Sequence, residues 1–308
     1  MKPRQRAAVN PATLSWARRV AGFSVEDAGK RSGMSADRLT QWEAGKARPT
    51  LRQLRLLGKA YRRPSAFFFK SKPPEDPQGI PDFRLLPDGA PAEGDSPALR
   101  YEIRRAQSRR QTALEIMSLI GEVARPVVLS AHRADGPERV GDRIRDALGV
   151  TIPEQFRWRD QYRALREWTR ATERVGVLVL QFSNVELDEA RGFSFAESPL
   201  SVIALNGKDS PRGRIFTLLH ELAHIALGQG GLCDLHEQDE GEWVEPFCNS
   251  VAAEALVPRK ALLETSEVRN HRRCRSATFR RAKNMPANVS ANIALNADSI
   301  VHPKFRLA

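Results

Sequence analysis

Residues 214–224 read Arg-Ile-Phe-Thr-Leu-Leu-His-Glu-Leu-Ala-His, and apolar residues continue to Leu227. This density of apolar residues predicts a helix buried on most sides, and the glycine-rich run that follows predicts its end. In such a helix His220 and His224 lie one turn apart on the same face. Two imidazoles at this spacing can bind one zinc ion, and Glu221 can act as a general base toward a water molecule. The pattern therefore indicates hydrolysis of a peptide bond.

A catalytic zinc ion takes three protein ligands and leaves a fourth position for water. A histidine six residues after His224 would complete one type of site, but that position is Gly230. His236 is one candidate for the third ligand, and also for the group that stabilises the oxyanion. A second candidate is Glu245, which can equally be a solvated acid among its acidic neighbours. The two histidines can also be accidental members of a buried helix, each bonded to a backbone carbonyl.

The run from Glu245 to Pro258 has the apolar pattern of a second helix, with Pro246 in its first turn and Pro258 at its end. Glu245 and Asn249 are four residues apart and share one face of that helix. Glu245 can then be the third ligand, and Asn249 can orient the imidazole of His220 without itself binding the metal. This spacing is typical of gluzincin-type peptidases.

Composition limits the class of protein. The chain has 308 residues, a 41% hydrophobic fraction and a net charge of +12, which favours polyanionic partners such as DNA. No apolar run is long enough to span a membrane, and no secretory signal follows the N-terminus. The cysteines, Cys233, Cys248 and Cys274, form no CxxC pair, so we expect a reducing, cytoplasmic location. Residues 265–308 are basic and predict a solvated tail or a nucleic-acid-binding arm.

Residues 12–69 predict a short helical bundle. Ser24 is a good N-cap for its second helix. The turn Gly33-Met34-Ser35 then leads into a third helix, residues 36–44, in which Leu39 and Trp42 face inward. A fourth helix covers residues 51–60, and the block Ala66-Phe-Phe-Phe69 closes the end of the bundle.

Ser24 to Pro49 resembles a helix-turn-helix of the Cro/C1 type. In that family the third helix enters the major groove of DNA. The resemblance implies that base edges and phosphates are met by Ser35, Ala36, Asp37, Thr40, Gln41 and Lys46. A bundle that no longer binds DNA is the alternative, because Val25 and Gly29 depart from the family pattern.

The middle of the chain predicts a proline-rich linker at residues 71–97 and a long amphipathic helix after it. Further helices are predicted at residues 140–148 and 161–174, and strands at residues 175–180 and 201–205. The second strand precedes the zinc-binding helix, so we expect its edge to receive an extended peptide. On that hypothesis a proline at Ala204 raises the Michaelis constant.

Residues 12–263 resemble the ImmA/IrrE family of metallopeptidases behind a Cro/C1-type domain. The resemblance is carried by Arg62-Arg-Pro-Ser-Ala-Phe-Phe-Phe69, Asp82-Phe-Arg84, residues 214–224 and residues 245–258. It implies zinc on His220, His224 and Glu245, with Glu221 as the base. It also implies that the substrate is a helix-turn-helix repressor, cleaved in a stress response or in mobile-element control.

These observations predict a multidomain α+β protein, mainly helical with a small sheet. We expect a DNA-binding helical bundle at residues 1–70, the linker at residues 71–97, a zincin-like metallopeptidase domain at residues 98–264 and a basic tail at residues 265–308. The expected partners are operator DNA, a repressor substrate and a second copy of the chain, with no membrane. The rival hypothesis is a DNA-binding repressor whose zincin-like domain is a non-proteolytic sensor or a toxin–antitoxin-type partner-binding module.

Overall fold

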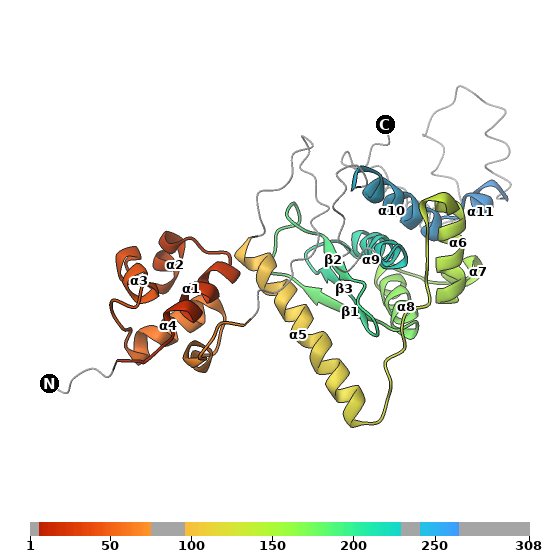
Figure 1. The fold of residues 1–308 in the computed structure, drawn as a ribbon. Coiled ribbons are helices and arrows are strands. Elements are labelled where there is room, and N and C mark those ends of the chain that lie inside the picture. The colour runs from red at the N-terminus through yellow and green to blue at the C-terminus, as the bar shows by residue number, and fades with distance from the viewer. Residues whose placement is uncertain (1–5, 75–95, 229–240, 265–308) are drawn as a thin grey trace, which may run out of the picture. The chain divides into compact units, whose positions relative to one another are not determined.

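The computed structural model describes residues 6–74, 96–228 and 241–264 of the chain. The chain divides into two compact units (Figure 1). Unit 1 contains the N-terminal bundle and the first turns of α5 (Pro97–Leu119), up to Arg105; unit 2 contains the rest of α5 and every later element. Within the described ranges, no helix combines the length and apolar character needed to cross a membrane.

The bundle in unit 1 consists of α1 (Pro11–Val20), α2 (Val25–Ser32), α3 (Ala36–Glu43), α4 (Leu51–Tyr61) and a short 3₁₀ helix, η1 (Ser65–Phe69). Ser24 caps α2 by accepting a hydrogen bond from the backbone N–H of Asp27. Gly33 ends α2 with a φ of 70°, in the left-handed region that favours glycine. The predicted helix-turn-helix connection is therefore confirmed.

The interior of the bundle contains Leu39 and Trp42, as predicted, together with residues of α1 and α4. The block predicted to close the end of the bundle does so through Phe67 and Phe68, which are buried in its core, whereas Ala66 and Phe69 are exposed. Three consecutive residues of a 3₁₀ helix point in three directions, so they cannot all face one core.

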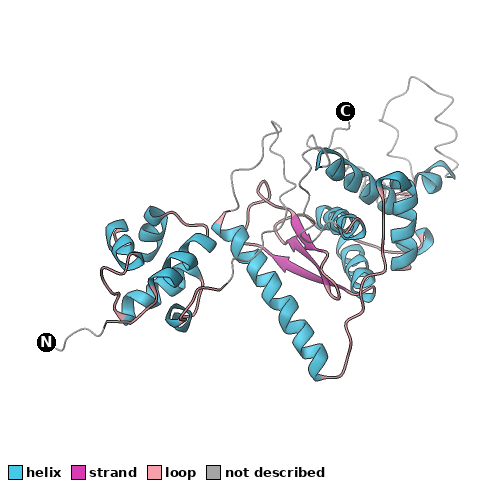
Figure 2. Cartoon of the chain, viewed as in Figure 1, coloured by secondary structure: helices cyan, strands magenta, loops and turns pink. Residues whose placement is uncertain are grey.

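Unit 2 is built mainly of helices around a small sheet (Figure 2). After α5 come η2 (Arg133–Asp135), α6 (Pro137–Leu148), α7 (Ile152–Phe156), α8 (Gln161–Arg174), β1 (Val177–Phe182), β2 (Gly192–Phe195), β3 (Ser201–Asn206), α9 (Pro211–Ala226), α10 (Gly241–Leu256) and α11 (Arg259–Glu264). The helices predicted at 140–148 and 161–174 and the strands predicted at 175–180 and 201–205 are confirmed within a few residues.

The sheet has the order β1-β3-β2, with β3 parallel to β1 and antiparallel to β2. Ala204 of β3 lies opposite Leu180 on one side and opposite Phe193 on the other. The strand predicted to offer a free edge is thus the central strand, and that hypothesis is wrong. A proline at Ala204 would instead remove a donor from inside the sheet. The short strand β2 was not predicted.

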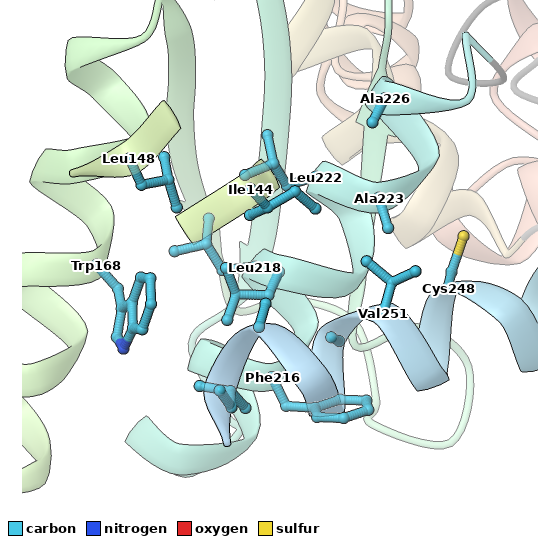
Figure 3. Close-up of a cluster of buried hydrophobic side chains, with 14 of the residues drawn as sticks. Ile144, Leu148, Trp168, Phe216, Leu218, Leu222, Ala223, Ala226, Cys248 and Val251 are labelled. Carbon is cyan, nitrogen blue, oxygen red and sulfur yellow. The ribbon is translucent and has the colours of Figure 1, made fainter. Parts of the chain in front are cut away.

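The helices form a layer against this sheet and a second layer behind it. α8 packs against β1 and α9, α9 packs against β2 and β3, and α10 packs against α9 and α6. Figure 3 shows part of this core, to which α6, α9 and α10 all contribute: Ile144, Leu218, Leu222 and Val251 belong to the same buried cluster. This layer of packed helices fixes α10 beside α9.

The start of α10 differs from the prediction. The helix begins at Gly241, so Pro246 lies inside it and not in its first turn. Proline is tolerated here because the only helical hydrogen bond that it removes is one to the carbonyl of Glu242, close to the N-terminal end. The predicted end before Pro258 is confirmed.

Candidate metal centre

Helix α9 presents His220 and His224 on one face. Ser210 caps the helix by accepting a hydrogen bond from Gly213, and Pro211 occupies its first turn. The two imidazoles lie one turn apart, with 3.0 Å between their Nε2 atoms. His224 is buried and His220 nearly so, as expected for a helix that is apolar on most sides.

Glu245 of α10 completes a triangle of donor atoms. Its Oε2 lies 3.2 Å from Nε2 of His220, and its Oε1 lies 3.1 Å from Nε2 of His224. At zinc–nitrogen and zinc–oxygen distances of about 2.0–2.1 Å, two corners of a tetrahedron are roughly 3.3 Å apart. The two ring nitrogens, and each nitrogen and the carboxylate oxygen nearest to it, thus have nearly the spacing of neighbouring ligands in a tetrahedral site. Within the described ranges, no other group of His, Cys, Asp and Glu gathers in this way.

The electrostatics of the triangle favour a cation. Burial alone would lower the pKa of His220, but the hydrogen bond and negative charge of Glu245 outweigh it and raise that pKa. Burial would raise the pKa of Glu245, yet the two histidines lower it to about 2. Two nitrogens and a carboxylate that converge on one point are a donor set that suits Zn²⁺.

Asn249 lies one turn after Glu245 on α10 and interacts with the His220 side chain, whose pKa it helps to raise. Its Oδ1 and the Nδ1 of His220 are both buried, and neither has a well-formed hydrogen bond within the described residues. An oxygen acceptor next to the second ring nitrogen of a ligand histidine is the arrangement that fixes the ring's tautomer. The structure therefore brings Asn249 into contact with His220.

Glu221, next to His220 on α9, contacts β2 through its carboxylate. Its Oε2 accepts a hydrogen bond of 2.7 Å from Oγ of Ser194, and both residues are buried. Gly192 on the same strand leaves room for α9, because a Cβ there would stand 2.5 Å from Cγ2 of Thr217. β2 is thus packed tightly against α9 at the level of Glu221.

Ser194 is the site residue that the sequence analysis missed. It lies in a four-residue strand, Gly-Phe-Ser-Phe, which is too short for an alternating pattern to stand out. The alternation is nevertheless present, since Phe193 and Phe195 flank the serine. His236, the rival third ligand, lies outside the described residues.

Cys248 is buried on α10, in the cluster of apolar side chains that Figure 3 shows. Burial, and then the charges of Glu245 and Glu221, raise the pKa of its thiol. A thiol in such surroundings behaves as a small hydrophobic residue. This agrees with its place in the apolar face of α10.

The helix-turn-helix places the predicted DNA contacts on one side of α3 and in the loop after it. Leu39 and Trp42 anchor the helix in the bundle. The opposite positions face solvent: Ser35, Asp37, Thr40, Gln41 and Lys46 are exposed, and Ala36 is partly exposed. Arg38 is exposed on the same helix and was not predicted as a contact.

The site is a candidate metal centre of the kind expected in a metallopeptidase, with two histidines one turn apart, a glutamate from a second helix and a glutamate next to the first histidine. Comparison with protein families agrees with this class. Residues 172–279 match the IrrE N-terminal-like domain of peptidase family M78, and residues 12–66 match a helix-turn-helix domain. No curated protein and no solved structure matches the chain. The chain thus carries a helix-turn-helix domain followed by an IrrE N-terminal-like domain, as the resemblance implied.

Proposed function

We propose that this chain is a zinc-dependent endopeptidase that binds DNA and regulates transcription by cleaving a helix-turn-helix repressor. The observation that carries the proposal is the convergence of His220, His224 and Glu245 within 3.0–3.2 Å of one another. These three residues would hold zinc, and Asn249 would orient His220. The helix-turn-helix domain in the same chain points to a regulatory protein as substrate.

Two features of the residues around the triangle support peptide hydrolysis as the reaction. A bound zinc ion would supply a Lewis acid that polarises the scissile carbonyl and a water molecule. Glu221 would accept a proton from the attacking water and donate it to the leaving amine nitrogen. The hydrogen bond from Ser194 holds Oε2 of Glu221 in place, which leaves Oε1 for the proton transfer.

For DNA, we propose that α3 reads an operator in the major groove through its exposed face. Asp37, Thr40 and Gln41 would face base edges, and Lys46 would meet a phosphate. Domains of this type read paired half-sites, so a homodimer on the operator belongs to the proposal. Operator binding and a repressor substrate both place the activity in the cytoplasm.

Proteolysis is tested with the zinc-loaded full chain and purified helix-turn-helix repressors encoded near its gene. We expect one repressor to be cut at a defined bond, mapped by mass spectrometry. The matched control is Glu221→Gln, which keeps the three zinc ligands and removes the base. Equal cutting by this variant would assign the activity to a contaminating protease.

The same variant separates the proposal from the rival, a repressor with a non-proteolytic sensor domain. We expect Glu221→Gln to bind zinc and operator DNA normally and to lose regulation in cells. Regulation that survives the substitution unchanged, with zinc still bound, would favour the sensor. DNA binding is measured separately, by the fall in operator affinity as salt is raised.

A further inference from the structure

A cavity in unit 1 is lined by arginines and aromatic rings. It lies where the C-terminal end of α4 and the segment before α2 meet the first turns of α5, and its volume is about 180 Å³. That volume has room for several water molecules or for a small anion. The side chains that matter are Arg31, Arg62 and Arg104 with Phe23, Tyr61 and Tyr101.

Two guanidinium groups of this cavity lie over aromatic rings, and none of its three arginines forms an ion pair with a described carboxylate. Arg62 lies 3.9 Å over the ring of Tyr101, and Arg31 lies 5.6 Å over the ring of Phe23. Nη1 of Arg104 donates a hydrogen bond of 2.7 Å to the carbonyl of Val20. Within the described ranges, none of these three arginines is within ion-pair distance of a carboxylate.

Arg104 shows the electrostatic consequence. Burial, and then the positive charges of Arg63, Arg100 and Arg62, lower its pKa to about 10. A partly buried cation surrounded by other cations is unfavourable unless an anion balances it. An anion bound in the cavity would therefore stabilise the charged form of Arg104.

The start of α5 adds to the same effect. Ser96, Pro97 and Ala98, at its first turn, line the cavity. The N-terminal end of a helix carries partial positive charge, which favours an anion. Pro97 has no N–H and the N–H of Leu99 donates to Oγ of Ser96, so the favourable contribution here is the helix dipole. Guanidinium forks match the oxygens of phosphate in pairs.

We propose that this cavity binds a small phosphate-bearing molecule and that the chain is thereby responsive to an effector. The ligand is a compact polyanion, held by Arg62 and Arg104 against the first turn of α5. None of the six residues predicted to contact DNA lines the cavity. α5 continues from unit 1 into unit 2, so the ligand would bear on a helix that both units share.

Binding is tested with the full chain and three probes, inorganic pyrophosphate, ATP and adenosine, by titration calorimetry and thermal shift. We expect pyrophosphate and ATP to bind saturably and adenosine not to bind. Arg62→Gln and Arg104→Gln should each weaken pyrophosphate binding at least ten-fold. Arg55→Gln, an exposed arginine of α4 outside the cavity, is the matched control and should leave binding unchanged.

Several outcomes would overturn the proposal. They are the absence of saturable binding by both phosphate probes, equal binding of adenosine, and full binding by both cavity variants. The last outcome would place the phosphate elsewhere, for example on zinc. Arg104 is partly buried, so circular dichroism checks that its variant folds, and the exposed Arg62 provides an independent variant. If either variant lost operator affinity without any ligand, the arginines would be a DNA-phosphate surface.

Discussion

Substituting Ser194 by alanine removes the hydroxyl that holds Glu221. The hydrogen bond is 2.7 Å long, and Ser194 and Glu221 are only 5% and 9% exposed, so water screens it little. A hydrogen bond to a charged group contributes about 1.5–3 kcal/mol. We therefore expect the free energy of unfolding of unit 2 to fall by that amount. For a domain of this size the melting temperature should drop by roughly 3–12 °C.

The contribution of the pair itself is measured with a double-mutant cycle. Ser194→Ala is made in the natural chain and in a Glu221→Met background, where no carboxylate remains to receive the hydrogen bond. Differential scanning calorimetry is the assay, because the two units can melt separately. We expect a coupling of about 1.5–3 kcal/mol. A coupling below about 0.5 kcal/mol would refute the reasoning, because the effects of two substitutions that do not interact already deviate from additivity by that much.

The same substitution should slow hydrolysis without changing zinc content. If the lost positioning of Glu221 raises the activation free energy by about 1.4–2.8 kcal/mol, the rate falls ten- to a hundred-fold. The loss should lie mainly in kcat, because Ser194 holds the base and not the substrate. Ser194→Thr retains a hydroxyl and should recover most of the activity. A threonine variant as slow as the alanine variant would mean that packing, not the hydrogen bond, matters.

Three further substitutions test the surrounding architecture. Asn249→Ala should weaken zinc binding about 10–100-fold, as measured by chelator competition, because the ring of His220 loses its orienting partner. Gly141→Ala should destabilise unit 2 by roughly 1 kcal/mol in calorimetry, since a Cβ there would stand 2.8 Å from Cβ of Glu254 on α10. Glu43→Ala should destabilise the bundle by roughly 2 kcal/mol in the same assay. The side chain of Arg18 is only 13% exposed and donates two hydrogen bonds to that carboxylate, so the substitution leaves a buried charge without its partner. Zinc binding unaffected by Asn249→Ala, or melting unaffected by either of the others, would contradict these assignments.

The parts of the site that the sequence predicted are those set by local geometry. His220, Glu221 and His224 belong to one helix, where the spacing of residues determines which face they share. The same holds for Glu245 and Asn249 on α10. The helix-turn-helix was predictable for a similar reason, because Ser24 and Gly33 are local signals for the start and end of α2.

The parts that the sequence did not predict depend on which elements pair. The position of β3 inside the sheet follows from its pairing with both β1 and β2. The sequence of residues 201–206 does not by itself predict that pairing. All six residues of β3 are buried, which an apolar run allows but does not require. Ser194 was missed because its role is defined by the partner across from it, Glu221 on α9.

The donor triangle combines these two kinds of information. The histidines could be placed by their spacing alone, whereas Glu245 could be distinguished from its acidic neighbours only by its relation to Asn249. What brings Glu245 within 3.2 Å of His220 is the packing of α10 on α9 and α6. That packing depends on Gly141, where α6 and α10 approach closely, and on buried small residues of α10 such as Cys248. Substitutions far from the histidines, but inside this interface, should therefore alter zinc affinity as much as stability.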